Sequence, residues 1–456
     1  MMPALQTEAP RQVLSFNRRI FQAVAWVGAA SIIVKVVAVA KEMAVAGVYG
    51  RSDAIEAFFA AALIPTLLIN LISESMSQAL VPTFVRVRDL ESTERAQQLF
   101  SNALIWMAVL LTAVSALMAL TAHLFFPLIA WHFPSAKLQL AIRLFYGLLP
   151  VVLITGVATL CTGVLNTFDK FALPALAPMA NSIVLIAGVL LLGGRLGIWV
   201  MVYATLAGAL AHTMLVGGML ERHGLRLRLR WYGFSDATRE VGRQYGPVLL
   251  SGVVASGGLV VDQAMAAMLP AGSVSALVYA NRFVSVILTL LAGSVSAAVT
   301  PYFSEMIAHR DWDECRRTLH TWVRAVLLVS APVTVALMLG GRLLVRVALQ
   351  HGAFGSHDTP VVTQVLIMFA IQVPFFAASR VYYRFLVAFR RTDLIFYCGA
   401  INLVLDVILN FLLMRWLGVA GIALATSLWT VSAFLFLWYW TRKLLPGNES
   451  NGNVRS

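Results

Sequence analysis

The chain has 456 residues, of which 60% are hydrophobic and 12% are charged, and its mean hydropathy is +0.82. These averages exclude a soluble globular domain and indicate an integral membrane protein. The net charge of +13 is no sign of a nucleic-acid partner, because the basic residues gather in alternate connections between apolar runs, which is the pattern of membrane topology.

Apolar runs of about 20 residues, the length of a membrane-spanning helix, recur along the chain between short polar breaks. The predicted spans are residues 22–48, 54–73, 101–123, 140–165, 173–194, 197–219, 246–269, 273–299, 322–340, 361–386, 394–414 and 417–440. They are continuously apolar, whereas a transmembrane barrel needs strands of alternating character. The sequence therefore predicts an all-α integral membrane protein with about twelve transmembrane helices.

Lysine and arginine concentrate in every second connection, on the side that the positive-inside rule assigns to the cytoplasm. This set contains Arg11, Arg18, Arg19, Arg86, Arg88, Arg95, Lys170, the 222–243 segment, Arg310, Arg316, Arg317, Arg390, Arg391, Arg442 and Lys443. The opposite connections hold Arg51, Lys137, Arg195, Arg342, Arg346 and Arg415. We therefore expect both termini in the cytoplasm, and no cleavable signal peptide is visible before the first helix.

Two blocks of sequence recur in the second half of the chain, which indicates an internal repeat. Ser77, Ala79, Pro82 and Phe84 of SQALVPTF correspond to Ser296, Ala298, Pro301 and Phe303 of SAAVTPYF. Further on, Phe168, Lys170, Asn181, Gly197, Ala204 and Thr205 correspond to Phe389, Arg391, Asn402, Gly418, Ala425 and Thr426. Each repeat holds six helices, so both enter the membrane from the same side, as in transporters built from parallel repeats.

This repeat predicts four segments: an N-terminal six-helix lobe over 1–220, a basic cytoplasmic linker over 221–245, a C-terminal six-helix lobe over 246–441 and a cytoplasmic tail over 442–456. The linker contains RHGLRLRLRWYGF, in which arginine alternates with leucine. We expect it to lie along the inner membrane surface with its arginines on anionic head groups, the alternative being a regulatory gate.

Charged side chains inside the spans mark a pathway, because a charge at mid-bilayer costs roughly 2.5 to 3.5 kcal/mol on insertion scales. They are Lys35, Lys41, Glu42, Glu56, Asp262, Arg282, Arg380, Arg384 and Asp406. Cations from both halves around one cavity predict an anionic cargo, and a lipid pyrophosphate fits ammonium and guanidinium groups. In the alternative interpretation Lys41 and Glu42 reach the outer interface and Lys35 only pairs with Glu56 or Glu42.

A second polar set lies in the C-terminal half. Asn402 and Asp406 share a face of the eleventh predicted helix, Asp262 lies within the seventh and Thr426 within the twelfth. Carboxylate, amide and hydroxyl oxygens are ligands for a small cation. The alternative is that Asn402 makes an interhelical hydrogen bond and the two aspartates hold protons, so sodium and proton remain equal candidates for a coupling ion.

Three stretches make the chain similar to a known family. The segment from Val34 to Phe84 resembles, without gaps, the first two helices of the MurJ (MviN) lipid II flippases of the MOP exporter superfamily. GSVSALVYANRF, Gly272 to Phe283, resembles the entry of the family's eighth helix, and LQHGAF, Leu349 to Phe354, resembles its motif after the ninth. The resemblance covers roughly residues 20 to 440.

The resemblance implies a flippase that carries an undecaprenyl-pyrophosphate-linked saccharide, lipid II or a similar precursor, from the cytoplasmic to the periplasmic leaflet of the bacterial inner membrane for cell-wall peptidoglycan synthesis. In the family, basic cavity residues bind the pyrophosphate. Here these are Lys35, Lys41 and Arg282, with Glu56 as their switching ion-pair partner. Some members bind sodium where Asp262, Asn402, Asp406 and Thr426 stand, together with a carbonyl that corresponds to Ile422.

The family's mode of action implies alternating access by a monomer, with membrane lipids and the lipid-linked glycan as its partners, no nucleic acid and no cofactor beyond Na⁺ or H⁺. The chain departs from the family at Ile69 and Asn70, where many members have two basic residues, and it ends after the twelfth predicted helix, where typical members have two more.

Three other functions remain open. An exporter of another lipid-linked polysaccharide unit shares the anionic cargo, whereas a MATE-like exporter of organic cations predicts a cavity dominated by acids. A membrane enzyme needs a large polar outer loop, but the longest one, Ala122 to Lys137, is largely apolar, and no nucleotide-binding or catalytic motif occurs. We therefore expect a transporter that makes and breaks no bond.

Overall fold

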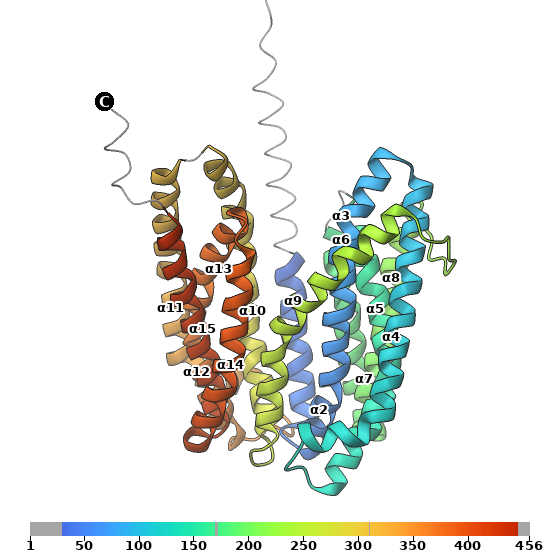
Figure 1. Ribbon diagram of the computed structural model, residues 1–456. Helices are drawn as coiled ribbons and strands as arrows, with labels where there is room; N and C mark the ends of the chain where they lie inside the picture. Colours follow the sequence, from blue (N-terminus) through green and yellow to red (C-terminus); the bar gives the residue numbers. More distant parts are fainter. Residues whose placement is uncertain (1–29, 169–171, 310, 446–456) are drawn as a thin grey trace, which may run out of the picture.

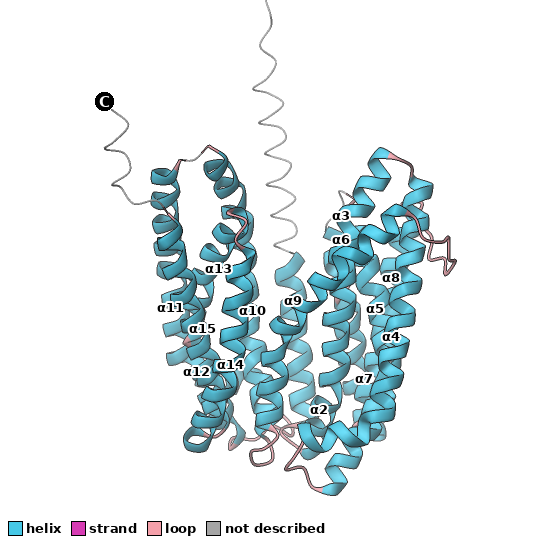
Figure 2. Cartoon of the chain, viewed as in Figure 1, coloured by secondary structure: helices cyan, strands magenta, loops and turns pink. Residues whose placement is uncertain are grey.

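The computed structural model describes residues 30–168, 172–309 and 311–445. Every regular element in these ranges is a helix (Figure 2). The predicted all-α class is therefore confirmed. Residues 22–29 of the first predicted span, Arg11, Arg18, Arg19, Lys170, Arg310 and most of the predicted tail lie outside the described residues.

The first half of the described chain begins with a helix over residues 30–49. It continues with α2 (Asp53–Leu68), η1 (Ile69–Ser73), α3 (Glu74–Leu90), α4 (Thr93–Ile129), α5 (Ser135–Leu165), α6 (Ala172–Leu176), α7 (Met179–Leu196) and α8 (Trp199–Arg222). The second half contains α9 (Asp236–Ala266), α10 (Ser273–Ala308), α11 (Trp312–Leu349), α12 (Asp358–Ala370), α13 (Gln372–Ala388), α14 (Thr392–Leu417) and α15 (Val419–Leu444).

Within the described ranges, 11 helices are long and apolar enough to cross a membrane, and they coincide with the predicted spans after the first. Several are longer than predicted. The 37 residues of α4 and the 38 residues of α11 exceed the roughly 20 that a bilayer needs, so both helices continue into water at one end. The first turns of both helices are polar, so the hydropathy of the sequence placed the starts of the predicted spans, at residues 101 and 322, after the true starts of the helices.

The helices form two lobes with separate cores. One core draws its buried residues from the chain between Val45 and Val241, and two others draw theirs mainly from the chain between Met265 and Leu445. Figure 1 shows the lobes spread apart at the end where α3 and α15 finish and brought together at the opposite end, near the start of α10. We call the end where the lobes are spread apart the open end, and the end near the start of α10 the closed end.

Helix α9 connects the lobes. Its first half packs against α3 and α4 of the N-terminal lobe, and its second half packs against α14 of the C-terminal lobe, so it runs obliquely across the space between them (Figure 1). Ser235 starts the helix by accepting a hydrogen bond from the Thr238 N–H at 3.2 Å. The connection between α8 and α9 is therefore 223–235, and the rest of the predicted 221–245 linker is helical.

The internal repeat is visible in the backbone. Gly197 ends α7 with φ 57° and ψ −141°, and its counterpart Gly418 ends α14 with φ 56° and ψ −135°. A side chain is strained at these angles, whereas glycine adopts them freely. In both lobes the same sharp turn therefore joins the last two helices.

Candidate functional site

A charged cluster joins the helix 30–49 to α10. The Arg282 Nε lies 3.2 Å from Glu42 Oε1, and the Lys41 Nζ lies 3.0 Å from the same oxygen. The Glu42 side chain is only 5% exposed, whereas the Arg282 side chain is 56% exposed. One buried carboxylate therefore holds two cations, one from each side of the molecule, and leaves the guanidinium free to meet a ligand.

Lys35 lies near this cluster and feels electrostatic repulsion from Arg282. It forms no ion pair with a carboxylate in the part of the chain that the structure describes. The structure thus brings Lys35, Lys41 and Arg282 into one neighbourhood, and the carboxylate that pairs with Lys41 and Arg282 is Glu42.

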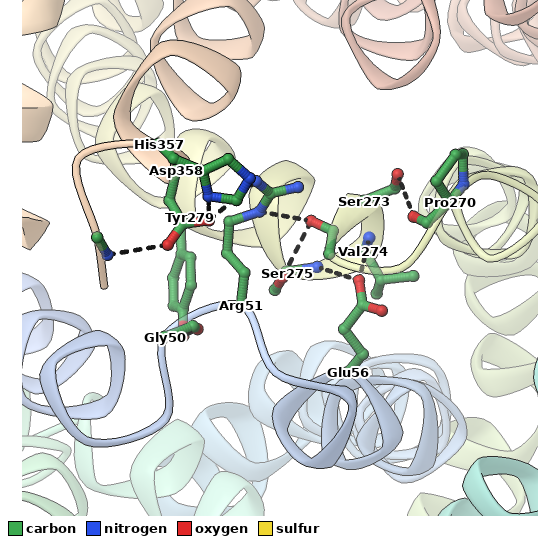
Figure 3. Close-up of polar contacts among 12 residues, drawn as sticks. Gly50, Arg51, Glu56, Pro270, Ser273, Val274, Ser275, Tyr279, His357 and Asp358 are labelled. Carbon is green, nitrogen blue, oxygen red and sulfur yellow. Dashed lines mark hydrogen bonds and ion pairs between the residues drawn. The ribbon is translucent and has the colours of Figure 1, made fainter. Parts of the chain in front are cut away.

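Glu56 is not the partner of these cations, contrary to the expectation. It is 1% exposed and lies at the closed end, where the Lys137 Nζ is 2.5 Å from its Oε2. Its Oε1 accepts the backbone N–H groups of Val274 at 2.8 Å and Ser275 at 3.2 Å, in the first turn of α10 (Figure 3). A helix N-terminus with free N–H groups favours a carboxylate, which explains why Glu56 docks there.

A second set of contacts closes the same end. The Arg51 Nε donates to the Gly272 carbonyl at 2.9 Å, and its Nη1 pairs with Asp358 at 3.1 Å (Figure 3). The Tyr279 hydroxyl donates to the Gly50 carbonyl at 2.9 Å. These bonds join the loop after the helix 30–49 to the starts of α10 and α12, so each of them holds the lobes together.

Two glycines allow the backbones to approach at the closed end. Gly50 and Gly352 have φ of 57° and 59°, and a Cβ on Gly352 would lie 2.1 Å from the Gly47 carbonyl oxygen. The same oxygen accepts the N–H of Ala353 at 2.8 Å. Larger residues at Gly50 or Gly352 would force these loops apart.

A stripe of exposed polar side chains runs along α2, η1 and α3 within a membrane-spanning helix. Its members, each four residues apart, are Thr66, Asn70, Glu74 and Gln78. Pro65 lacks an N–H and disturbs the helix just before the π-helical turn Ile69–Ser73, which widens the helix and keeps these positions on one face. Polar groups within a membrane-spanning helix are expensive against lipid, so we expect the stripe to face the space between the lobes.

The predicted cation site is partly assembled where α9, α14 and α15 meet. The Asn410 amide donates to Asp262 Oδ1 at 2.8 Å and to Asp406 Oδ1 at 3.1 Å. The Thr426 hydroxyl lies 3.1 Å from both Asp262 Oδ2 and the Ile422 carbonyl. Asp406 Oδ2 and Asn410 Oδ1 are buried without a partner among the described residues, so oxygens suited to a cation remain unused.

Asn402 does not join this set. Its amide donates to the Cys398 sulfur at 3.4 Å, one turn away on the same helix. Asn410, one turn beyond Asp406, takes the place that the sequence assigned to Asn402. The described residues contain no cluster of three or more His, Cys, Asp or Glu side chains that could hold a metal ion.

A profile of the family described as lipid II flippase MurJ matches residues 45–454. The chain belongs to the MurJ family. Among curated relatives, the probable lipid II flippase MurJ of Buchnera aphidicola is 22% identical over 91% of this chain and 81% of its own length. The lipid II flippase MurJ of Burkholderia cenocepacia is 26% identical over 77% of this chain and 70% of its own length.

Solved structures agree with the MurJ fold. A lipid II flippase MurJ in an inward closed conformation has a TM-score of 0.78 at 24% identity, covering 91% of this chain and 87% of its own. An inward-facing multidrug MATE transporter of the MOP superfamily has a TM-score of 0.75 at 14% identity, covering 91% of this chain and 94% of its own. The resemblance predicted from sequence is therefore confirmed, for the family and for the fold.

The stretches that resemble MurJ proteins converge in this structure. At the closed end, the first stretch is contacted by both of the others. The contacts come from Val274, Ser275 and Tyr279 of the second stretch and from Ala353 of the third. Arg282, the last polar residue of the second stretch, reaches Glu42 of the first. Sequence reasoning missed Lys137, which it counted as a residue of an outer connection; the structure places it in the first turn of α5, where it pairs with Asp53 and Glu56.

Proposed function

We propose that this chain is a lipid II flippase: it carries undecaprenyl-pyrophosphate-linked peptidoglycan precursor from the cytoplasmic to the periplasmic leaflet by ion-coupled alternating access. Membership of the MurJ family supports the substrate. Helices α3 and α15 end, and α4 and α14 begin, at the open end (Figure 1). The sequence puts Arg86, Arg95, Arg391 and Arg442 near these four helix ends, which by the positive-inside rule supports a cytoplasmic open end.

The observation that carries the proposal is the shared use of Glu42 by Arg282 and Lys41. A pyrophosphate offers these cations charged oxygens that a planar guanidinium binds in a bidentate fashion. Substrate therefore competes with Glu42, and its arrival breaks an ion pair that joins helix 30–49 to α10. Binding in this way changes the forces between the lobes, which is what alternating access requires.

The contacts at the closed end stabilise the conformation in which the other end is open. Glu56, Arg51 and Tyr279 hold the lobes together there while the other end is open. For the substrate to leave on the periplasmic side, these contacts have to break and the helix ends at the cytoplasmic side have to meet. In this proposal no bond is made or broken in the cargo, and an ion gradient supplies the free energy for transport.

The coupling ion binds, in this proposal, between α9, α14 and α15. Asp262, Asp406 and Thr426 offer oxygens, and the Ile422 carbonyl is close to the hydroxyl of Thr426. Sodium needs several hard oxygen ligands, which these groups and the unpaired Asn410 Oδ1 provide, while a proton needs only one carboxylate. Because α9 also contacts the N-terminal lobe, an ion held here biases the angle between the lobes.

The test is native mass spectrometry of the purified full chain with lipid II and with other undecaprenyl-pyrophosphate saccharides. We compare wild type with Arg282→Gln and Lys35→Gln, and use Arg415→Gln as the matched control. Arg415 is also an exposed arginine of a membrane-spanning helix, but it lies over the Phe411 ring, far along the chain from the cluster.

We expect wild type and the Arg415 variant to retain lipid II in preference to the other lipids, and both cluster variants to lose roughly tenfold or more, because a charged hydrogen bond contributes about 1.5 to 3 kcal/mol. Equal retention in all four proteins would show that the cluster is not the pyrophosphate site.

A second function, export of another lipid-linked saccharide, is favoured by one observation. The stripe of Thr66, Asn70, Glu74 and Gln78 presents hydrogen-bonding groups and one acid, and it includes Asn70, one of the two positions where many family members have basic residues. Such groups suit sugar hydroxyls better than phosphate. Preferential retention of a different lipid-linked glycan, still lost with Arg282→Gln, would assign the chain to this function.

A further inference from the structure

The connection between the lobes is tied down at both ends. Near its start, the Arg226 N–H donates to Gln97 Oε1 at 2.7 Å, and Gln97 Nε2 donates back to the Arg226 carbonyl at 2.8 Å. Near its end, the Asn102 amide accepts from the Tyr232 N–H at 2.8 Å and donates to the Gly233 carbonyl at 2.9 Å. Both anchors are on α4, so this segment is fixed to the N-terminal lobe.

Aromatic rings strengthen the second anchor. Trp231 stacks on Trp106 of α4 with 6.2 Å between the centroids and 10° between the planes, and Phe234 meets both rings edge-on. A linker whose only task is to join two moving lobes needs no such docking. The stretch between the anchors, Leu227 to Arg230, is therefore held in a defined place.

The anchored segment nevertheless keeps a large part of its surface exposed. Leu229 is 73% exposed and Phe234 is 64% exposed, while Arg226, Arg228 and Arg230 are exposed beside them. Figure 1 shows the segment projecting sideways from the N-terminal lobe, beside α4 and α8, rather than beyond the helix ends. The segment therefore lies along the flank of the lobe, where a surrounding bilayer would meet it, and not beyond the end of the bundle.

We infer that residues 226–234 form a docking surface for anionic phospholipid head groups of the leaflet at the open end. Leucine and phenylalanine enter the boundary between head groups and acyl chains, and the arginines bind lipid phosphates, as in interfacial segments that alternate the two chemistries. An acidic soluble partner would match the charge, but it would leave Leu229 and Phe234 uncovered at the lipid boundary. The inference does not depend on which glycan the protein carries.

This docking surface has a mechanical consequence. Helix α9 begins at Asp236, two residues after Phe234, and carries Asp262 near its other end. A lipid contact at 226–234 therefore fixes the first turn of α9 relative to the leaflet while its second half moves with α14. Anionic lipid becomes a regulator of the motion between the lobes.

A single fluorescent label tests the contact directly. The three cysteines, Cys161, Cys315 and Cys398, are buried, so a cysteine introduced by Leu229→Cys is the reactive one for an environment-sensitive dye. The labelled full chain is placed in nanodiscs of phosphatidylcholine, with or without phosphatidylglycerol. We expect blue-shifted emission and quenching by a nitroxide on the lipid head group, both stronger with phosphatidylglycerol.

A pair of matched variants separates a built surface from net charge. Arg228→Gln with Arg230→Gln removes two charges from the docking surface, and Arg239→Gln with Arg243→Gln removes two exposed charges from the first turns of α9. The first pair is expected to lower affinity for phosphatidylglycerol roughly fivefold per arginine, and lysines at the same two positions are expected to restore it.

The inference fails if the dye reports water in both membranes, or if the α9 pair lowers lipid affinity as much as the linker pair. It also fails if the blue shift grows with protein density at fixed lipid composition, because a second copy of the chain would then cover the surface. Since none of these readouts uses lipid II, they are independent of the mass-spectrometric test of lipid II binding.

Discussion

Replacing Glu56 by glutamine weakens the closed end without changing its shape. In wild type the carboxylate binds two N–H groups of α10 across the lobe interface and one lysine within its own lobe. Glutamine keeps an acceptor oxygen but loses the charge, and a charged hydrogen bond is stronger than a neutral one by about 1 kcal/mol. Two such bonds give about 2 kcal/mol, or roughly a 30-fold shift towards separated lobes.

The shift is measured as a distance between spin labels on the two lobes. Cysteines introduced by His132→Cys and Ser356→Cys place the labels on exposed positions beside the closed end, after the three native cysteines are replaced by serine. We expect the distance distribution of Glu56→Gln to gain a longer component at the expense of the short one. Lipid II, added in excess, should enlarge that component in wild type as well.

Asp53→Asn is the control, because Asp53 pairs with the same Lys137 at 2.7 Å but has no hydrogen bond or ion pair with α10 in the described structure. Its side chain is 61% exposed, so the loss of its charge is screened by water. Distances that change equally in both variants would show that Lys137 governs the closed end through general charge balance. Distances that change in neither would refute the reasoning that Glu56 joins the lobes.

Three further predictions follow from the same structure. Asn410→Leu removes an amide from the two aspartates, so any sodium-dependent rise in melting temperature should disappear. Asn402→Leu, whose amide donates to the Cys398 sulfur and not to an aspartate, should retain it. Gly257→Val places a Cβ 2.9 Å from Leu403, so it should separate α9 from α14 and lower the melting temperature by several degrees. Gly246→Val is the control, because nothing lies within 4 Å of a Cβ at that position. Equal changes in melting temperature would contradict this packing. Arg51→Gln leaves the nearly buried Asp358 with the exposed His357 ring, at 3.4 Å, in place of a permanent cation, and should cost about 3 to 5 kcal/mol of closed-end stability, read from the same label pair. An unchanged distance would show that His357 replaces Arg51 as the partner of Asp358.

Much of the architecture can be predicted from local patterns of hydropathy, glycine and charge in the sequence. Length and hydropathy of the apolar runs determined the all-α class, because a bilayer leaves the backbone few other ways to satisfy its hydrogen bonds. The paired glycines Gly197 and Gly418 show that even a turn shared by the two repeats could be found by comparing the halves. The cations Lys35, Lys41 and Arg282 stood out because charges are rare at that depth.

Only the tertiary structure decided which polar side chains pair with one another. Sequence places Glu42 and Glu56 in neighbouring helices with the same chemistry, and only the packing of α10 sends one to Arg282 and the other to Lys137 and a helix N-terminus. Asn410, and not Asn402, binds the aspartates for the same reason. Both asparagines share a helical face with Asp406, but the position of α9 brings Asp262 next to Asn410. Spacing along a helix fixes which side chains can meet, whereas the approach of a distant helix fixes which of them do.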